Sequence, residues 1–243
     1  MTRPLVVLAC GVLEDLLGKR LPPGMPTTWM DVTLHNSPKK LSVALNEKLD
    51  ALPEPSTVLL GYGLCGNGLV GVKAGPHTLI VPRTHDCVAI FLGSHQRYVQ
   101  RFFASPNTYY LTKGWIDAKD EPLTDYLDYV RDYDEETADY LIEMKYRHYR
   151  KLCMVGFSQE ELDACRPRVL EVAKFLADRF GVEYEETLGS AELIEGLLAM
   201  PDRLGEANDA FVVVPPGGEI AMDLFMHGDG PGPQPLGRAE KGG

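Results

Sequence analysis

Short apolar runs divide the first part of the chain into alternating strands and helices. Residues 4–9 (PLVVLA), 57–60 (TVLL) and 78–81 (TLIV) are rich in leucine and β-branched residues, a composition typical of buried strands. Residues 39–52 carry leucines at helical spacing and predict an amphipathic helix that ends before Pro53. This order of strand, helix and strand predicts a parallel sheet.

The remainder of the chain continues this alternation. Helices are predicted at residues 88–104, 158–180 and 190–199, and two more with aromatic inner faces in the acidic, tyrosine-rich segment 117–150. Further strands are predicted at residues 28–34, 108–112, 182–188 and 211–217. Ser158 with Glu161 fits a helix-capping pattern, Pro167 is expected to break or restart that helix, and Gly181 to end it.

Together these elements predict an α/β fold with one mostly parallel, Rossmann-like sheet flanked by helices. Residues 1–225 are expected to form a single domain in which residues 117–150 are a helical insertion. Residues 226–243 have too little apolar content to fold and are predicted to be a disordered tail.

Composition narrows the class of protein. Of the 243 residues, 44% are apolar and 24% are charged, which is ordinary for a soluble globular chain. A net charge of −11 without a basic cluster argues against binding to nucleic acid. No apolar run is long enough for a signal peptide or a membrane span, so a cytoplasmic location is expected. The five cysteines should then be reduced, which leaves metal binding, catalysis or burial as their roles.

Three of the cysteines follow predicted strands. Cys10 comes after residues 4–9, Cys65 after 57–60 and Cys87 after 78–81. Ligand sites in open α/β sheets lie beyond the carboxyl ends of the strands, so we expect these thiols to converge. The other two cysteines, at positions 153 and 165, are interpreted as helical and close to the surface, and are left out of the site.

Metal binding is the first interpretation of these thiols. Three thiolates without a fourth ligand suit a [4Fe–4S] cluster, whose open iron would act as a Lewis acid on a substrate. The alternative is zinc, held by His85 and Cys87 with Cys65 or Cys10 and activating a thiol for methyl transfer. For any one of these cysteines considered alone, the alternative is a purely structural role as a small, buried apolar residue.

The glycine-rich loop around Cys65 allows other interpretations. Its possible ligand-binding residues are Gly61, Gly63, Gly66, Asn67 and Gly68. The loop matches G-x-G-x-x-G, but the glycines and the proline that follow leave no room for the long helix that a dinucleotide site needs. Binding of some other anion by its backbone amides is the broader possibility.

Several polar residues near the same loops are candidates for catalysis. A Cys–His nucleophile pair could combine Cys65 or Cys10 with His85 or His35. His35 could also be a metal ligand, but a histidine that caps the turn before Pro38 is the favoured interpretation. Arg83 lies between a buried strand and the Cys87 loop, where it could bind a substrate carboxylate or phosphate.

The order of motifs resembles that of a family known only as domain of unknown function 1638. The similarity rests on LHNSP, GYGLCGNG, PRTHDCVAIFLGS, TYYLTKGW and FVVVPPG, and it covers roughly residues 4–220. Members are similar to one another around Cys10, Cys65, His85 and Cys87. They often occur near genes for corrinoid-dependent methyl transfer from methylated amines, which implies a role in one-carbon metabolism.

From the sequence we therefore expect a metal-dependent enzyme, of lyase or methyltransferase type, or an accessory protein. Its substrate would be a small methylated, sulfur-bearing or carboxylated molecule. A non-catalytic partner of a corrinoid methyltransferase system is the alternative from a different functional class. Neither the substrate, the reaction nor the oligomeric state follows from the sequence.

Overall fold

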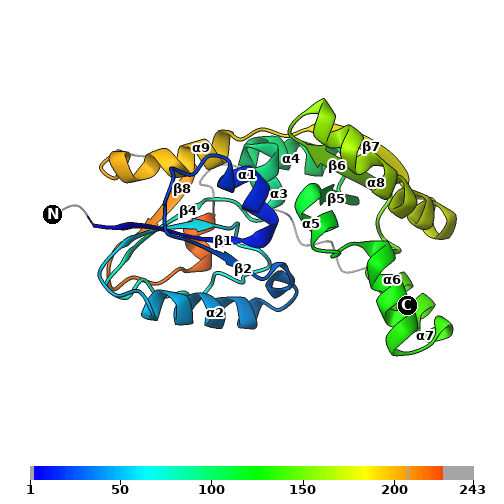
Figure 1. Cartoon of the computed structure of the whole chain (residues 1–243), viewed down its shortest axis with the longest axis horizontal. Helices are drawn as coiled ribbons and strands as arrows, with labels where there is room; N and C mark the ends of the chain where they lie inside the picture. Colours follow the sequence, from blue (N-terminus) through cyan, green and yellow to red (C-terminus); the bar gives the residue numbers. More distant parts are fainter. Residues whose placement is uncertain (1–2, 207, 227–243) are drawn as a thin grey trace, which may run out of the picture.

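The structure, a computed structural model, describes residues 3–206 and 208–226. Its strands form two separate sheets (Figure 1). The sequence predicts one sheet, and this is wrong because residues 108–188 build a sheet of their own before the chain returns to the first. The α/β class and the mostly parallel strand order are confirmed.

The first sheet has five strands in the order β2-β1-β3-β4-β8. All neighbours are parallel except β8, which pairs antiparallel with β4. Residues 182–188 and 211–217 were both predicted as strands of one sheet, but they lie in different sheets. The strands are β1 (Leu5–Cys10), β2 (Thr27–Met30), β3 (Thr57–Gly61), β4 (Thr78–Pro82) and β8 (Phe211–Val214).

The second sheet has three parallel strands in the order β5-β6-β7. They are β5 (Thr108–Thr112), β6 (Lys151–Gly156) and β7 (Glu183–Leu188). The strands predicted at 108–112 and 182–188 are confirmed, and β6 was not predicted. Cys153 lies inside β6 and is fully buried, so its assignment to a surface helix was wrong.

Helices cover both sheets (Figure 1). The helix α2 lies under the first sheet and α9 on its other side, while α8 packs along β6 and β7. Among the described residues, no helix is long and apolar enough to cross a membrane. The bounds are α1 (Glu14–Gly18), α2 (Pro38–Asp50), α3 (Val88–Leu92), α4 (His95–Ala104), α5 (Lys113–Asp117), α6 (Pro122–Asp132), α7 (Glu135–Tyr146), α8 (Gln159–Phe180) and α9 (Glu192–Ala199), with the 3-10 turns η1 (Gly11–Leu13), η2 (Val32–Asn36), η3 (Met200–Arg203) and η4 (Met222–Phe225).

Most predicted helices are confirmed, but α8 contradicts the expectation that a proline inside a helix breaks it. Ser158 caps α8 by accepting a hydrogen bond from the Glu161 N–H at 3.2 Å, and Gly181 ends the helix in the left-handed conformation. The helix nevertheless runs through Pro167 without a break. Buried side chains on both sides of the proline, among them Cys165, pack on the sheet and stabilise the helix against the lost hydrogen bond. Cys165 is thus buried, not a surface residue.

Two further predictions need a comment. The helix expected at 88–104 is two helices, because Gly93 adopts φ +77° and Ser94 caps α4 anew. The tail predicted at 226–243 lies outside the described residues except for Met226.

Candidate functional site

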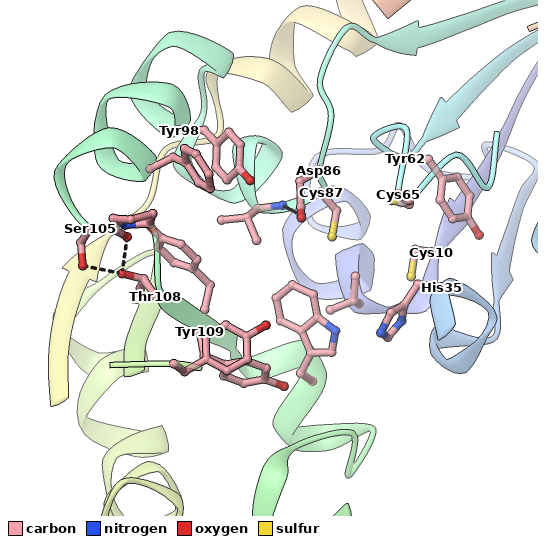
Figure 2. A pocket seen from close by; sticks show the side chains of 18 of the residues that line it. Cys10, His35, Tyr62, Cys65, Asp86, Cys87, Tyr98, Ser105, Thr108 and Tyr109 are labelled. Atoms are coloured by element: carbon pink, nitrogen blue, oxygen red, sulfur yellow. Dashed lines mark hydrogen bonds between the residues drawn. The ribbon is translucent and has the colours of Figure 1, made fainter. Parts of the chain in front are cut away.

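The carboxyl ends of the parallel strands in the first sheet meet at one edge and carry the thiols. Cys10 is the last residue of β1, Cys65 follows β3 and Cys87 follows β4. The structure brings these three residues, together with His35 after β2, into the wall of one pocket of about 450 Å³ (Figure 2). This is the edge at which open α/β sheets bind ligands.

Backbone contacts hold the Cys65 and Cys87 loops against each other. The Leu64 N–H donates to the Thr84 carbonyl oxygen at 2.8 Å, and the Cys65 N–H donates to that of His85 at 3.2 Å. A Cβ atom on Gly63 would lie 2.6 Å from the Asp86 carbonyl carbon, so only glycine permits this approach. The close packing of the two loops places the Cys65 thiol within hydrogen-bond reach of the Cys87 thiol.

The Cys65 loop has an unusual backbone. Cys65, Gly66 and Asn67 are consecutive residues in the left-handed region, with φ values of 47°, 60° and 71°. Cysteine rarely adopts this conformation, and such strain persists only where the surroundings impose it. Strain of this kind is concentrated at functional sites, and here it fixes the direction of the Cys65 side chain.

Cys10 and Cys87 hold their protons tightly. The pKa of Cys87 is raised, first by its hydrogen bond with the Cys65 thiol and then by burial. Burial also raises the pKa of Cys10 from its ordinary value of 9.0 to about 12, and the neighbouring Cys65 adds to this. Among the described residues, the pocket lining contains no lysine or arginine that would favour a thiolate. At neutral pH, Cys10 and Cys87 are therefore protonated thiols in the metal-free protein.

Tyr62 is a residue of this group that the sequence analysis missed. It is buried beside Cys10 and Cys65 (Figure 2), and its hydroxyl oxygen has no hydrogen-bond partner among the described residues. Burial and the nearby thiols raise its pKa, so it remains a hydrogen-bond donor. Its position three residues before Cys65 in the glycine loop was the only signal in the sequence.

Aromatic side chains form the opposite wall of the pocket. Figure 2 shows Tyr98 and Tyr109 facing the sulfur atoms across the cavity. These residues belong to α4 and β5, so the pocket lies between the first sheet and the elements around β5. The aromatic lining comprises Tyr62, Tyr98, Phe102, Tyr109, Tyr110, Trp115 and Tyr149.

His35 lines the pocket but its ring nitrogens already have neighbours. Its Nδ1 lies 2.6 Å from the Val32 carbonyl oxygen within η2, which fits the turn-capping role favoured from the sequence. Its Nε2 lies 3.8 Å from the Asp120 carboxylate. Burial raises the pKa of Asp120, while the charge of His35 opposes that rise.

The side chains of Arg83 and His85 have contacts outside the thiol pocket. Neither lines the thiol pocket. Arg83 lies 3.9 Å from Asp209, and the His85 ring packs against that of His95 with the centroids 5.2 Å apart. The chain turns into α3 at Cys87, so residues 85 and 87 do not share a side as they would in a strand.

The glycine loop serves mainly to allow close packing. A Cβ on Gly61 would lie 2.5 Å from that of Ala9, and one on Gly68 would lie 2.7 Å from Leu41. Gly66 lines the thiol pocket. Residues 65–71 form turns, and the described stretch between Gly61 and Val88 contains no α-helix, so the loop lacks the helix that a dinucleotide site requires.

The side chains do not form a ready-made metal site as they stand. Within the described part of the chain, no group of three or more histidine, cysteine, aspartate or glutamate side chains is arranged to hold a metal ion. The thiols share a pocket and two of them are in contact, but a metal would have to reorient them.

The fold and the pocket define a mixed α/β protein with a cysteine-rich ligand pocket at the carboxyl edge of a mostly parallel sheet. A model of a family of proteins of unknown function, DUF1638, matches residues 29–198, and the chain belongs to this family. The matched segment includes Cys65 and Cys87 and begins after Cys10. Searches of curated proteins and of solved structures found no match.

Proposed function

We propose that Cys10, Cys65 and Cys87 hold a metal centre at which a small molecule reacts. The preferred centre is a [4Fe–4S] cluster, whose open iron would supply a Lewis acid. The observation that carries this proposal is the arrival of three thiols from three separate loops at one pocket wall. Isolated buried cysteines that serve as apolar filler have no reason to gather there.

The electrostatics of the pocket favour a metal over a free cysteine nucleophile. A nucleophilic cysteine needs a lowered pKa and a nearby cation or base. Here the pKa values of Cys10 and Cys87 are raised, and the lining has no lysine or arginine. A bound metal would supply the missing positive charge, and Tyr62 could then donate a hydrogen bond to a thiolate sulfur.

The position of His85 favours the cluster over the zinc alternative. Zinc was expected to take a nitrogen from His85, but that ring packs on His95 outside the thiol pocket. His35 and His148 also line the pocket, but a set of three sulfur ligands suits iron and sulfide better than a catalytic zinc. Either metal would require Cys65 and Cys87, which now touch, to rotate their side chains toward it.

The aromatic wall narrows the class of substrate. A carboxylated molecule would be bound best by lysine or arginine, and the described residues that line the pocket include neither, only the histidines His35 and His148. The aromatic faces opposite the thiols suit a small, partly apolar molecule. Among the substrates expected from the sequence, the methylated and sulfur-bearing ones therefore fit this pocket better.

Metal analysis of protein purified without oxygen tests the proposal. We expect about four iron and four sulfide per chain in the parent, and neither in a Cys10→Ser, Cys65→Ser, Cys87→Ser variant. The two remaining buried cysteines supply the matched control, since Cys153→Ser, Cys165→Ser protein should keep the cluster. About one zinc per chain would support the alternative metal. Absence of both metals from the parent, or equal loss in the control, would refute the three-cysteine centre.

A further inference from the structure

A second pocket lies at the carboxyl edge of the second sheet. Its volume is about 200 Å³. Thr112, the last residue of β5, lines it, as do Phe157 and Ser158, which follow β6. The rule that places ligands beyond the carboxyl ends of parallel strands therefore applies to both sheets of this protein.

Basic side chains are concentrated in this pocket. Lys19, Arg20 and Lys113 line it, together with the carboxylates Asp15 and Glu161. The lining thus has three basic and two acidic side chains, and two further carboxylates, Asp117 and Glu195, pair with Lys113 and Arg20. No such surplus occurs in the thiol pocket, where lysine and arginine are absent from the lining.

The basic groups are held in place by neighbouring residues. The Lys113 Nζ lies 2.8 Å from an oxygen of Asp15 and also pairs with Asp117. The Arg20 Nη1 donates to the Leu16 carbonyl oxygen at 2.7 Å. These contacts fix the two cations at the pocket before any ligand arrives, which reduces the entropy cost of binding.

The start of α8 adds a positive potential. Ser158 is the N-cap of this 22-residue helix and lines the pocket. The N-terminus of a long helix attracts anions through its dipole and its backbone N–H groups. Glu161 in the first turn offsets part of this potential, so the helix end alone does not define a site.

A buried hydroxyl points independently to a ligand. Thr112 is 2% exposed, and its Oγ1 has no hydrogen-bond partner among the described residues. A buried hydroxyl without a partner is costly and is rare in folded proteins. An oxygen of a bound anion would supply that partner, because a hydroxyl can donate to it.

We propose that this basic pocket, defined by Lys19, Arg20, Thr112, Lys113 and Ser158, binds the phosphate group of a small molecule. Thr112 donates a hydrogen bond to a phosphate oxygen, and the three cations, which also contact Asp15, Asp117 and Glu195, attract its charge. The proposal does not depend on a metal at the thiols, because no cysteine lines this pocket.

Titration of the full chain with inorganic phosphate tests the proposal. In phosphate-free buffer at constant ionic strength, we expect saturable binding by calorimetry and a saturable rise in Tm. Acetate at the same concentration should bind at least tenfold more weakly. The Cys10→Ser, Cys65→Ser, Cys87→Ser variant should still bind phosphate saturably, which separates this test from that of the metal centre.

Two variants decide whether the pocket is responsible. Thr112→Val keeps the shape and removes the hydroxyl, so it should fold and bind phosphate about tenfold more weakly. Arg20→Gln should weaken binding similarly, while Arg203→Gln, an equal charge change outside the pocket, should not. Unsaturable binding by the parent, or equal binding by Thr112→Val and the parent, would overturn the proposal. Should Thr112→Val misfold, equal affinities of the Arg20→Gln and Arg203→Gln proteins would overturn it instead.

Discussion

Replacing Gly63 with alanine should separate the two loops that carry Cys65 and Cys87. The new Cβ would lie 2.6 Å from the Asp86 carbonyl carbon and 2.8 Å from both the Asp86 oxygen and the Thr84 Oγ1. These neighbours are a backbone carbonyl and a buried side chain, so neither can move aside without shifting its loop. The substitution must therefore push one loop away from the other.

The expected cost follows from the contacts that this shift breaks. The hydrogen bonds from the Leu64 N–H to Thr84 and from the Cys65 N–H to His85 join the loops. Each contributes about 0.5–1.5 kcal/mol, and overpacking costs about 1–3 kcal/mol. Because the shift relieves part of the overpacking, we expect Gly63→Ala to lower the free energy of unfolding by about 2–4 kcal/mol.

Urea unfolding followed by far-UV circular dichroism measures this change. The midpoint should fall by about 1 M, given a slope near 3 kcal/mol per molar urea. Gly205→Ala is the control, since its Cβ would meet no atom within 4 Å and should change stability by less than about 0.5 kcal/mol. A loss below about 1 kcal/mol for Gly63→Ala would show that the loops do not depend on this close approach.

Three further predictions concern backbone strain, thiol protonation and a buried ion pair. Asn67→Gly should raise stability by about 0.5–1 kcal/mol in urea unfolding, because φ is 71° there. The folded protein keeps the Cys10 proton up to a pKa of about 12 whereas the unfolded chain loses it near 9.0, so Cys10 should make stability fall as pH rises between these values. Unfolding of parent and Cys10→Ser protein from pH 8 to 11 measures that difference, and parallel curves would contradict it. Arg168→Met should lower the free energy of unfolding by about 3 kcal/mol, because it leaves the Glu121 carboxylate, which is 1% exposed, without its cation. A loss of less than about 0.5 kcal/mol in urea unfolding would contradict this prediction.

Local sequence patterns were sufficient for the edge that carries the thiols. The runs before Cys10, Cys65 and Cys87 are continuous and apolar because their strands are buried on both faces. They can therefore be recognised as strands from the sequence alone. Once three such strands are taken as parallel, their carboxyl ends must share an edge. The shared edge of parallel strands was therefore enough to predict that Cys10, Cys65 and Cys87 line one pocket.

The other features depend on contacts between distant segments. The partner of β4 is β8, from the far end of the described chain, and no local pattern distinguishes it from a neighbour of β7. The aromatic wall is similarly non-local, since Tyr98, Tyr109 and Tyr149 belong to different elements. Arg83 and His85 were assigned to the thiol site by proximity in sequence, but neither is among the residues that line the thiol pocket.

The two proposed sites meet at the turn η1. Val12 lines both pockets, and its N–H is hydrogen-bonded to the Cys10 thiol. A Cβ on Gly114 would lie 2.3 Å from the Val12 carbonyl oxygen, so α5 rests directly on this turn. A phosphate held beside Lys113 and a metal held by Cys10 would thus each fix the same three residues, Gly11–Leu13. If binding at one site orders that turn for the other, linkage requires that phosphate and metal raise each other's affinity by the same factor.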